Sequence, residues 1–315
     1  MIVIELLMQS DKGREIILSF ILLNYNNVNY TIPCIESIKN VVKVAHEIIV
    51  VDNGSTDNSI ERLSGISGIT LVKNKTNRGF TGGNNDGAKV ARGKYLVVLN
   101  NDTVLEDERI NELPIVLDSL GRYDVVGGKL VGVDDKPQPS GGYEPYPLFL
   151  FLQFTVLCYK KFSFPWLKRF YFSEWMNDRI QKVDWASGCF FAMRRDTFIE
   201  LGGFDENIFI YLDEVDLHKR ARYKGGNVYL YPQFIIKHYG QVSWGSKHYI
   251  GLRHNYNSAV YYLGKYRGLS YKFFFIISVK LVNLIYLPFL SFLNIIKNNV
   301  KLKNKLKFCL TLITA

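Results

Sequence analysis

A chain of 315 residues is long enough to bury a full core, as one large domain or two. Apolar residues make up 48% and charged residues 22%, a globular composition that excludes extensive disorder. The 39 basic residues exceed the 29 acidic ones, and the net charge of +10 favours an anionic partner such as nucleotide phosphates, acidic lipid headgroups or nucleic acid.

The cysteines and the start of the chain indicate a cytoplasmic protein. Four cysteines are widely spaced and form no C-x-x-C pair, which favours free thiols in a reducing compartment over a zinc site. They are Cys34, Cys158, Cys189 and Cys309. The opening MIVIELLMQSDKGREI has no basic start, long apolar stretch or small-residue cleavage site, so we expect no signal peptide.

Residues 16–127 alternate between short apolar runs and segments with helical spacing. The runs predict strands at 16–25, 47–52, 69–74 and 94–102. Between them, residues 31–42 and 57–65 place apolar side chains at i, i+3 and i+4, as amphipathic helices do. Strands rich in Val, Ile and Leu and separated by helices predict an α/β fold with a mostly parallel central sheet flanked by helices.

Every one of these predicted strands ends in polar residues. The ends read Asn24-Tyr25-Asn26, Asp52-Asn53-Gly54-Ser55, Asn74-Lys75-Thr76-Asn77 and Asn100-Asn101-Asp102. Ligands of such sheets bind beyond the carboxyl ends of the strands. One polar end is an ordinary turn, but four at the same edge of a sheet predict a binding site.

Asp52 stands at the second strand end. Its carboxylate can accept a hydrogen bond from the imide N–H of a uracil or thymine ring. Gly54 and Ser55 permit a tight turn, and Asp57 can cap the following helix. The alternative is a plain turn, because Asp-Asn-Gly is common in turns.

Glycines cluster after Arg78 in the segment 74–93. They are Gly79, Gly82, Gly83 and Gly87. Clustered glycines let the backbone approach a ligand closely, and arginine can pair with phosphate oxygens. The segment is neither a P-loop nor a G-x-G-x-x-G motif, so the alternative is a generic glycine-rich loop.

Asp102 ends the strand predicted at 94–102. A divalent cation held there could bridge to a nucleoside diphosphate, with Asn100 or Asn101 adding oxygens directly or through water. A reaction that releases a nucleoside diphosphate would use such a cation, because the charge that grows on the leaving diphosphate must be neutralised.

A second acidic group, followed by a histidine, lies in the segment 183–240. Asp213, Glu214 and Asp216 could begin a helix, where acids complement the macrodipole, and we expect that structural role for Asp216. Crowded carboxylates in a pocket would instead raise a pKa towards the range of a general base, which is the interpretation we prefer. His238 is either structural or completes a mixed nitrogen and oxygen metal sphere.

Two further segments suggest contact with a membrane. Residues 143–172 are aromatic and basic, and form either a helical insertion or a surface that contacts membrane or acceptor. Residues 273–292 have spanning length, but three residues interrupt them: Lys280, Asn283 and Pro288. We therefore expect an interfacial or in-plane segment rather than a transmembrane helix. The lysines of 297–307 suit an anionic cytoplasmic leaflet or else mark a solvated helix end.

Several ordered motifs resemble the family 2 glycosyltransferases of the GT-A fold, above all their rhamnosyltransferase-like branch. The motifs are ILLNYNN, EIIVVDNGSTDNS, NRGFTGGNNDG, YLVVLNNDT, SGCFFAMRRDTFIELGGFDENIFIYLDEVDLHKRARYKG and HYGQVSW. The likeness covers roughly residues 15–265. It implies a GT-A domain over 1–265, with a nucleotide-binding half at 15–127 and an acceptor half at 128–265, followed by a helical membrane-associated extension at 266–315.

The resemblance also implies roles for single residues. The donor-binding set would be Asn24, Asn26, Asp52, Asn53, Arg78, Gly79 and Asn101. Asp102 and His238 would hold Mg²⁺ or Mn²⁺, and Gly188, Cys189 and Asp216 would lie on the acceptor and sugar side. Glu214 would be the catalytic base. Two departures matter: Asn100 replaces the first acid of the D-x-D motif, and the acidic pair is reversed, which leaves Asp213 as the alternative base.

The reaction implied is an inverting sugar transfer at the inner face of the cell membrane. A pyrimidine nucleoside diphosphate, dTDP-rhamnose or a UDP-sugar, would donate the sugar to a hydroxyl of a glycan or lipid-linked glycan. One alternative is a nucleotidyltransferase, but its glycine-rich loop after the first strand is missing from NYNNVNYTIP. Another is a non-catalytic module for nucleic acid or membrane, in which the acidic clusters have no role. We expect no nucleic-acid partner.

Overall fold

The computed structural model describes residues 15–155, 179–240, 248–297 and 300–315. The chain separates into two compact units. The first consists of Met1–Tyr143, Tyr171–Glu206 and Asp213–Ser243, and the second of Glu144–Phe170, Asn207–Leu212 and Trp244–Ala315. The boundary expected at residue 265 falls within a helix of the second unit, α10 (His248–Arg267), and not between the units.

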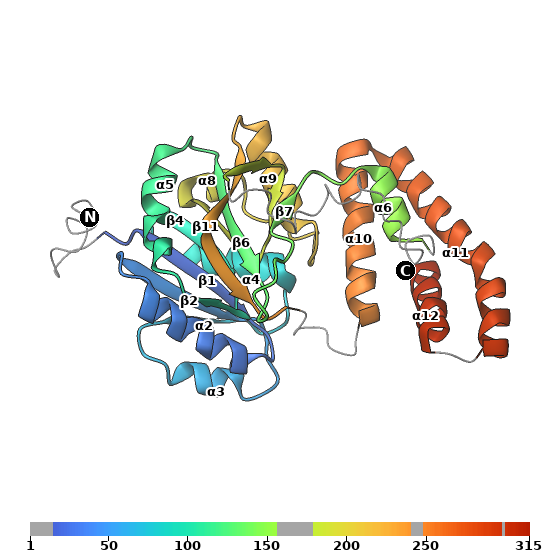
Figure 1. Cartoon of the computed structure of the whole chain (residues 1–315), viewed down its shortest axis with the longest axis horizontal. Helices are drawn as coiled ribbons and strands as arrows, with labels where there is room; N and C mark the ends of the chain where they lie inside the picture. The colour runs from blue at the N-terminus through green and yellow to red at the C-terminus, as the bar shows by residue number, and fades with distance from the viewer. Residues whose placement is uncertain (1–14, 156–178, 241–247, 298–299) are drawn as a thin grey trace. The chain divides into compact units, whose positions relative to one another are not determined.

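The first unit is an α/β structure built on one large mixed sheet (Figure 1). Its strands are β1 (Leu18–Asn24), β2 (His46–Asp52), β3 (Thr70–Lys73), β4 (Tyr95–Asn100), β5 (Thr103–Leu105), β6 (Val125–Val131), β8 (Gln181–Val183), β10 (Phe190–Arg194) and β11 (Val228–His238). The order is β3-β2-β1-β4-β10-β6-β11-β5, with β8 paired to β11. Only β10, β5 and β8 among these strands run against the rest, so the sheet is mostly parallel, as predicted.

Helices and a small second sheet complete this unit. The helices are α2 (Val28–Val41), α3 (Ser59–Ser64), α4 (Gly79–Val90), a 3₁₀ turn (Glu108–Glu112), α5 (Leu113–Ser119), α8 (Arg195–Glu200) and α9 (Asp213–Tyr223). The small sheet pairs β7 (Gly141–Gly142) with β9 (Trp185–Ala186).

Apolar side chains fill both faces of the large sheet. Phe20 and Leu22 of β1 pack in one core cluster with Ile35 of α2. Ile21, which points to the other face, packs in a second cluster with Ala88 of α4. Strands covered on both sides need continuous apolar sequences, which is why these runs do not alternate.

The glycine-rich segment forms a helix. One alternative considered from the sequence was a generic glycine-rich loop. Residues 79–90 form α4, and its four glycines are buried. A Cβ added at Gly83 would lie 2.2 Å from Leu23 Cδ1, and one at Gly87 would lie 2.5 Å from Ile21 Cγ2. These two glycines therefore let the helix pack closely on β1, rather than bringing backbone to a ligand.

The second unit is helical. It contains α6 (Pro147–Gln153), α10, α11 (Leu269–Lys297) and α12 (Val300–Thr314). Phe154, Tyr256, Phe275 and Leu312 meet in its core. α11 continues through Pro288. Among the described residues, its stretch Leu269–Asn294 is the one helix that is long and apolar enough to cross a membrane, judged by length and composition.

Candidate active site

The carboxyl ends of β1, β2 and β4 meet at one edge of the large sheet. Asn24 lies opposite Asp52 in the β1–β2 pair, and Leu23 lies opposite Asn100 in the β1–β4 pair. The polar strand ends singled out in the sequence are therefore neighbours in space. This edge is where ligands of open α/β sheets bind.

Asp52 is completely buried at this edge. Its Oδ2 accepts a hydrogen bond of 2.8 Å from Asn24 Nδ2, and its Oδ1 accepts one of 3.0 Å from the backbone N–H of Ser55. The carboxylate thus fixes the turn after β2. Its contact with a base stays a prediction, because the observed partners are protein groups.

Two asparagines hold the neighbouring loops. Asn26 has a left-handed backbone (φ +51°), and its Oδ1 accepts from the N–H of Thr56 at 2.7 Å. Buried Asn53 donates to the carbonyl of Gly79 at 2.9 Å and accepts from the N–H of Arg78 at 3.2 Å. Asn26 and Asn53, two members of the expected donor-binding set, therefore shape the loops that line this edge of the sheet.

Arg78 is paired with two carboxylates. It forms an ion pair with Asp86 and another, of 2.6 Å, with Glu206. The hydrogen bond with Asp86 raises the pKa of the guanidinium. A phosphate could reach Arg78 only by sharing or displacing these partners, so its predicted role at the border of the nucleotide remains open to test.

Asp102 and His238 meet, although they are far apart in the sequence. Asp102 lies in the turn between β4 and β5, and β11 pairs His238 with Thr103 of β5. His238 Nε2 is 3.4 Å from Asp102 Oδ1, and Asp102 is only 5% exposed. Burial opposes the charged imidazole, but hydrogen bonds with Asp102 and Cys189 raise the pKa of His238 to about 10.

Gln138 orients this histidine and was not anticipated from the sequence. His238 Nδ1 lies 2.7 Å from Gln138 Oε1, and Gln138 Nε2 donates to the backbone carbonyl of His238 at 3.1 Å. In the charged imidazole, Nδ1 donates to Gln138 Oε1 and the protonated Nε2 faces Asp102, so a bound cation would take the place of the Nε2 proton. Gln138 lies in a loop without periodicity, where no sequence pattern marks it.

The donor set at this point suits a divalent cation. A carboxylate and an oriented imidazole are ligands that Mg²⁺ and Mn²⁺ accept, and such ions take their remaining ligands from water and substrate phosphates. Within the described residues, no group of three or more His, Cys, Asp or Glu side chains could hold a metal. Asp102 and His238 would therefore hold the ion together with a bound diphosphate rather than alone.

Cys189 joins the same cluster. Its Sγ accepts a hydrogen bond of 3.3 Å from Asn100 Nδ2 and lies 3.5 Å from His238 Nε2. The preceding Gly188 is packed against Phe80, whose Cζ would lie 3.3 Å from an added Cβ. The structure thus brings Cys189 beside the expected metal ligands.

The acidic group begins α9. Asp213 is buried and Glu214 half-buried, and burial raises the pKa of Glu214, while the side-chain hydrogen bond with Asp213 acts in the opposite direction. Tyr211 and Leu212, which precede them, have left-handed backbones. The hydrogen bonds and ion pairs found among the described residues do not join Glu214 to the Asp102–His238 pair.

Asp216 has a structural role, which is the role that we expected for it from the sequence. Its Oδ2 is 2.8 Å from Nη2 of Arg220, one turn later in α9. Arg220 in turn donates to the carbonyls of Leu201 and Gly203. This fully buried carboxylate therefore secures the loop after α8, and its expected place on the acceptor side gains no support from these contacts.

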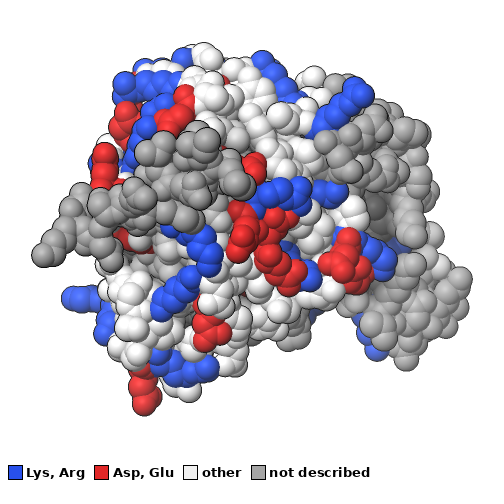
Figure 2. Space-filling view, turned by 60° about the vertical axis from the view of Figure 1, so that its left-hand side comes forward, with Lys and Arg blue, Asp and Glu red and all other residues white. Residues whose placement is uncertain are grey.

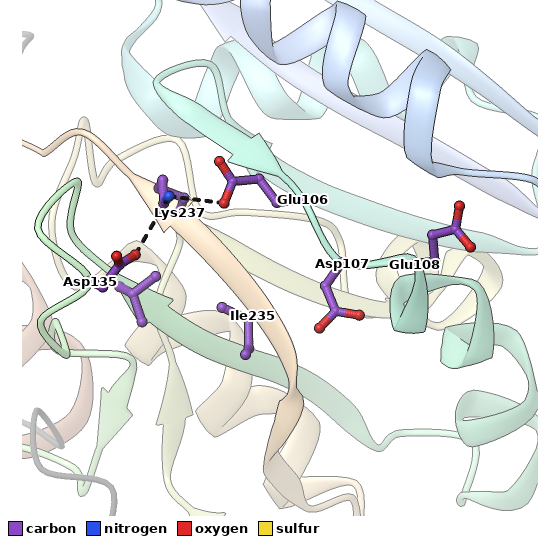
Figure 3. A pocket seen from close by; sticks show the side chains of 7 residues that line it. Glu106, Asp107, Glu108, Asp135, Ile235 and Lys237 are labelled. Atoms are coloured by element: carbon purple, nitrogen blue, oxygen red, sulfur yellow. Dashed lines mark ion pairs between the residues drawn. The ribbon is translucent and has the colours of Figure 1, made fainter.

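A separate acidic cavity of about 320 Å³ lies beside β11 (Figure 3). It is lined by Glu106, Asp107, Glu108, Val131, Asp135, Ile235 and Lys237. Lys237 pairs with Glu106 at 2.9 Å and with Asp135 at 3.5 Å. Neighbouring residues of a strand point to opposite faces, so this cavity and His238 lie on different faces of β11. Its acidic lining does not suit a diphosphate.

Comparisons with known proteins agree with this fold. Residues 19–202 match a family model described as Glycosyl transferase family 2. The low-salt glycan biosynthesis hexosyltransferase Agl10 of Haloferax volcanii is 25% identical over 67% of this chain and 63% of its own length. The rhamnosyltransferase WbbL of Escherichia coli is 32% identical over 28% of this chain and 33% of its own. The chain thus spans less than two thirds of the length of these curated relatives.

Two solved structures share the fold. GalNAc-T7 with UDP, GalNAc and Mn²⁺ aligns with a TM-score of 0.54 and 15% identity, over 72% of this chain and 44% of its own. The mannosyltransferase PcManGT of Pyrobaculum calidifontis, in complex with GDP-Man and Mn²⁺, aligns with a TM-score of 0.50 and 14% identity, over 97% of this chain and 87% of its own. At these identities the likeness concerns the fold.

Proposed function

Since this chain belongs to glycosyl transferase family 2 and has the GT-A fold, we propose that it transfers a sugar from a nucleoside diphosphate donor to an acceptor hydroxyl. The observation that carries the proposal is the Asp102–His238 pair at the carboxyl edge of the sheet. A carboxylate and an imidazole 3.4 Å apart, beside the polar ends of three parallel strands, suit a cation-bound diphosphate.

In this proposal Asp102 and His238 would hold a divalent cation at the diphosphate end of the donor. When bound, the cation neutralises the charge that develops on the leaving diphosphate. Gln138 keeps His238 in the tautomer that binds through Nε2. GalNAc-T7 and PcManGT both carry Mn²⁺, which supports the choice of Mg²⁺ or Mn²⁺ for this chain.

Glu214 removes the proton from the acceptor hydroxyl as that oxygen attacks the anomeric carbon. The bond to the diphosphate breaks in the same displacement, so the configuration inverts and no covalent enzyme intermediate forms. Burial raises the pKa of Glu214 towards values useful for a general base. Asp213, its hydrogen-bond partner, is the alternative base.

The donor that we favour is a pyrimidine nucleoside diphosphate, either a UDP-sugar or dTDP-rhamnose. Asp52 can accept a hydrogen bond from the imide N–H that uracil and thymine share. GalNAc-T7 was solved with UDP, and PcManGT with GDP-Man, so the fold accommodates both kinds of base. Because Asp52 is fully buried here, its side chain must become accessible before it can contact a base.

The acceptor that we propose is a glycan or lipid-linked glycan at the inner face of the cell membrane. Most exposed residues of α11 are large and apolar, including Phe274, Ile277 and Ile285 at more than 60% exposure. Asn283, which interrupts the apolar sequence, is instead fully buried and donates to the carbonyl of Phe154. A helix that buries Asn283 and exposes large apolar side chains suits lipid rather than water, and this supports in-plane or peripheral membrane contact.

The charges on the face shown in Figure 2 do not favour nucleic acid as the partner. On the face shown in Figure 2, basic and acidic side chains lie next to one another instead of forming one basic field. Nucleic-acid binding needs a continuous basic surface to follow the phosphate backbone. A small anionic donor requires only a local site.

A donor screen tests the proposal. The full chain would be incubated with UDP-, dTDP- and GDP-sugars, with and without Mn²⁺, and released nucleoside diphosphate measured. We expect metal-dependent release from a UDP- or dTDP-sugar, and none from the Asp102→Ala variant. Preference for a GDP-sugar would overturn the role of Asp52, and metal-independent release would overturn the role of Asp102 and His238.

A further inference from the structure

A buried chain of hydrogen bonds connects two ends of the candidate site. Asn101 Nδ2 donates to Thr31 Oγ1 at 2.7 Å, and Thr31 Oγ1 donates to Asn24 Oδ1 at 2.7 Å. Asn24 Nδ2 then donates to Asp52 Oδ2 at 2.8 Å. Thr31, Asn24 and Asp52 are completely buried, and Asn101 is 8% exposed. Three strand ends and α2 are thereby linked through side chains.

Thr31 is the central member of this chain. A hydroxyl has one hydrogen to donate and lone pairs to accept with, and Thr31 Oγ1 uses both functions on two different strands. A threonine inside a helix commonly donates to the carbonyl four residues earlier. That carbonyl, of Asn27, lies 3.2 Å away, farther than Asn24 Oδ1. The shorter contact, across to β1, links α2 to the strand end.

The two ends of this series of hydrogen bonds correspond to two parts of the proposed donor. Asn101 adjoins Asp102, where the diphosphate is expected, and Asp52 is where the base is expected. Holding Asn101 Nδ2 fixes the plane of its amide, and holding Asn24 fixes the Asp52 carboxylate. The two ends of the site therefore keep one spacing, so a donor has to expose buried Asp52 but need not also set its separation from Asn101.

We propose that Thr31 is a positioning residue that sets the separation between the nucleobase end and the diphosphate end of the donor site. The proposal rests on the proposed function and deepens it. Thr31 acts through Asn24 and Asn101, and it needs no contact with the substrate.

Two substitutions of Thr31 separate its hydroxyl from its shape. Thr31→Val keeps the branched shape but leaves Asn24 Oδ1 and Asn101 Nδ2 without their partner, whereas Thr31→Ser keeps the hydroxyl. Thr81→Val is a matched control. Thr81 is an equally buried threonine of α4 whose hydroxyl has no hydrogen-bond partner among the described residues.

The readout is binding of uridine, and of UDP with Mn²⁺, measured by calorimetry on the full chain. In Thr31→Val we expect UDP to bind about ten-fold more weakly, the effect of one or two lost buried hydrogen bonds, and uridine less than about three-fold more weakly. Thr31→Ser and Thr81→Val should both stay within about three-fold of the wild type for UDP. A role in general stability alone would weaken both ligands equally, and that result overturns the proposal. So does a Thr31→Ser variant as weak as Thr31→Val.

A second measurement requires no nucleotide. The N–H of Ser55 donates to Asp52 Oδ1, so its hydrogen exchange reports on the Asp52 end of this series of hydrogen bonds. We expect Thr31→Val to speed that exchange about ten-fold and Thr31→Ser to restore it. Unchanged exchange in Thr31→Val would overturn the positioning role whatever the ligand. If exchange at Ser55 is faster in Thr31→Val but the wild type binds no pyrimidine nucleotide, the positioning role of Thr31 is supported and the proposed function is overturned.

Discussion

The two units of the chain differ in the side chains that they leave at the surface. In the α/β unit, apolar side chains fill both faces of the sheet, and polar residues gather at the strand ends, where buried partners satisfy them. In the helical unit, α11 buries Asn283 and exposes Phe274, Ile277 and Ile285. The proposed function assigns these two surfaces to two environments, with a polar ligand at the strand ends and lipid along α11.

Removing the Asp102 carboxylate should have the largest effect. In Asp102→Ala we expect turnover to fall about 10³-fold or more, because the diphosphate would leave without charge neutralisation, while binding to lipid vesicles stays unchanged. Initial rates with the donor identified by the screen give the measurement. Asp135→Asn is the control: Asp135 pairs with Lys237 on the other face of β11, and asparagine tolerates its left-handed backbone. A loss of vesicle binding in Asp102→Ala would mean that the two units do not act separately.

Neutralising Glu214 should reduce turnover about 10²- to 10³-fold, because a general base contributes on this scale. The wild-type rate should also fall as pH drops through the raised pKa of Glu214, since the base acts only when ionised, and burial moves that pKa above its ordinary value. Rates of Glu214→Gln and Asp213→Asn across pH provide the test. If Asp213→Asn loses turnover and Glu214→Gln keeps it, Asp213 is the base.

Polar substitutions on the exposed face of α11 should weaken membrane binding about 100-fold. Replacing Phe274, Ile277 and Ile285 together by serine removes three large apolar groups, each of which contributes about 1.5–3 kcal/mol on full burial, and in-plane contact buries them only in part. Co-sedimentation with phosphatidylglycerol vesicles measures the effect. Turnover of a soluble acceptor should not change. Deleting residues 271–315 is a poorer test, because Phe275 and Leu312 belong to the core of the helical unit.

The control for this experiment is a second triple serine variant in the α/β unit. Val133, Ile180 and Ile199 are also more than half exposed, but Val133 and Ile180 lie outside the helices and strands and Ile199 is in α8, so the three form no helical face. Their substitution should leave co-sedimentation unchanged. Equal losses in both triple variants would show that exposed apolar residues bind lipid without specificity, and the contrast between the two units would then fail.

The sequence predicted the sheet and its polar edge well, for a simple physical reason. Strands buried on both faces need continuous Val, Ile and Leu, and such runs are visible without a structure. The family resemblance paired Asp102 with His238 as metal ligands; the structure places the two side chains 3.4 Å apart, and their binding of a metal stays a prediction. The role of 79–90 was harder to see, because Gly and Asn disfavour helices, and only close packing on β1 explains α4.

Residues that act through other residues left no pattern in the sequence. Thr31 lies in an ordinary amphipathic segment, and its hydroxyl gains meaning only when β1 and β4 bring Asn24 and Asn101 to it. Gln138 reaches His238 across the fold in the same way. The burial of Asn283 could not be predicted either. The sequence shows that a polar residue interrupts the apolar run, but it does not show whether that residue faces the core or the surface.

The smallest effect that we predict concerns His218, a buried polar group of the α/β unit. Burial, together with Arg222 and Arg220, lowers the pKa of His218 to about 3, and its Nδ1 accepts from the N–H of Ala186 at 3.2 Å. In the unfolded chain the pKa lies near 6.5, so between pH 6.5 and 3 the unfolded state binds the additional proton, and stability falls as pH falls. This group should remove about 2 kcal/mol of the free energy of unfolding between pH 7 and pH 5.

His218→Asn provides the matched comparison for this effect, because asparagine can accept from Ala186 and does not titrate. Urea titrations of both proteins at pH 7, 6 and 5 would give the difference in unfolding free energy, which should change by about 2 kcal/mol in favour of the variant as pH falls. Parallel stability curves would show that His218 is not held neutral in the folded unit. The interior of the α/β unit would then admit water or charge, which we otherwise expect only at the strand ends. The difference between the two units would in that case rest only on the exposed face of α11.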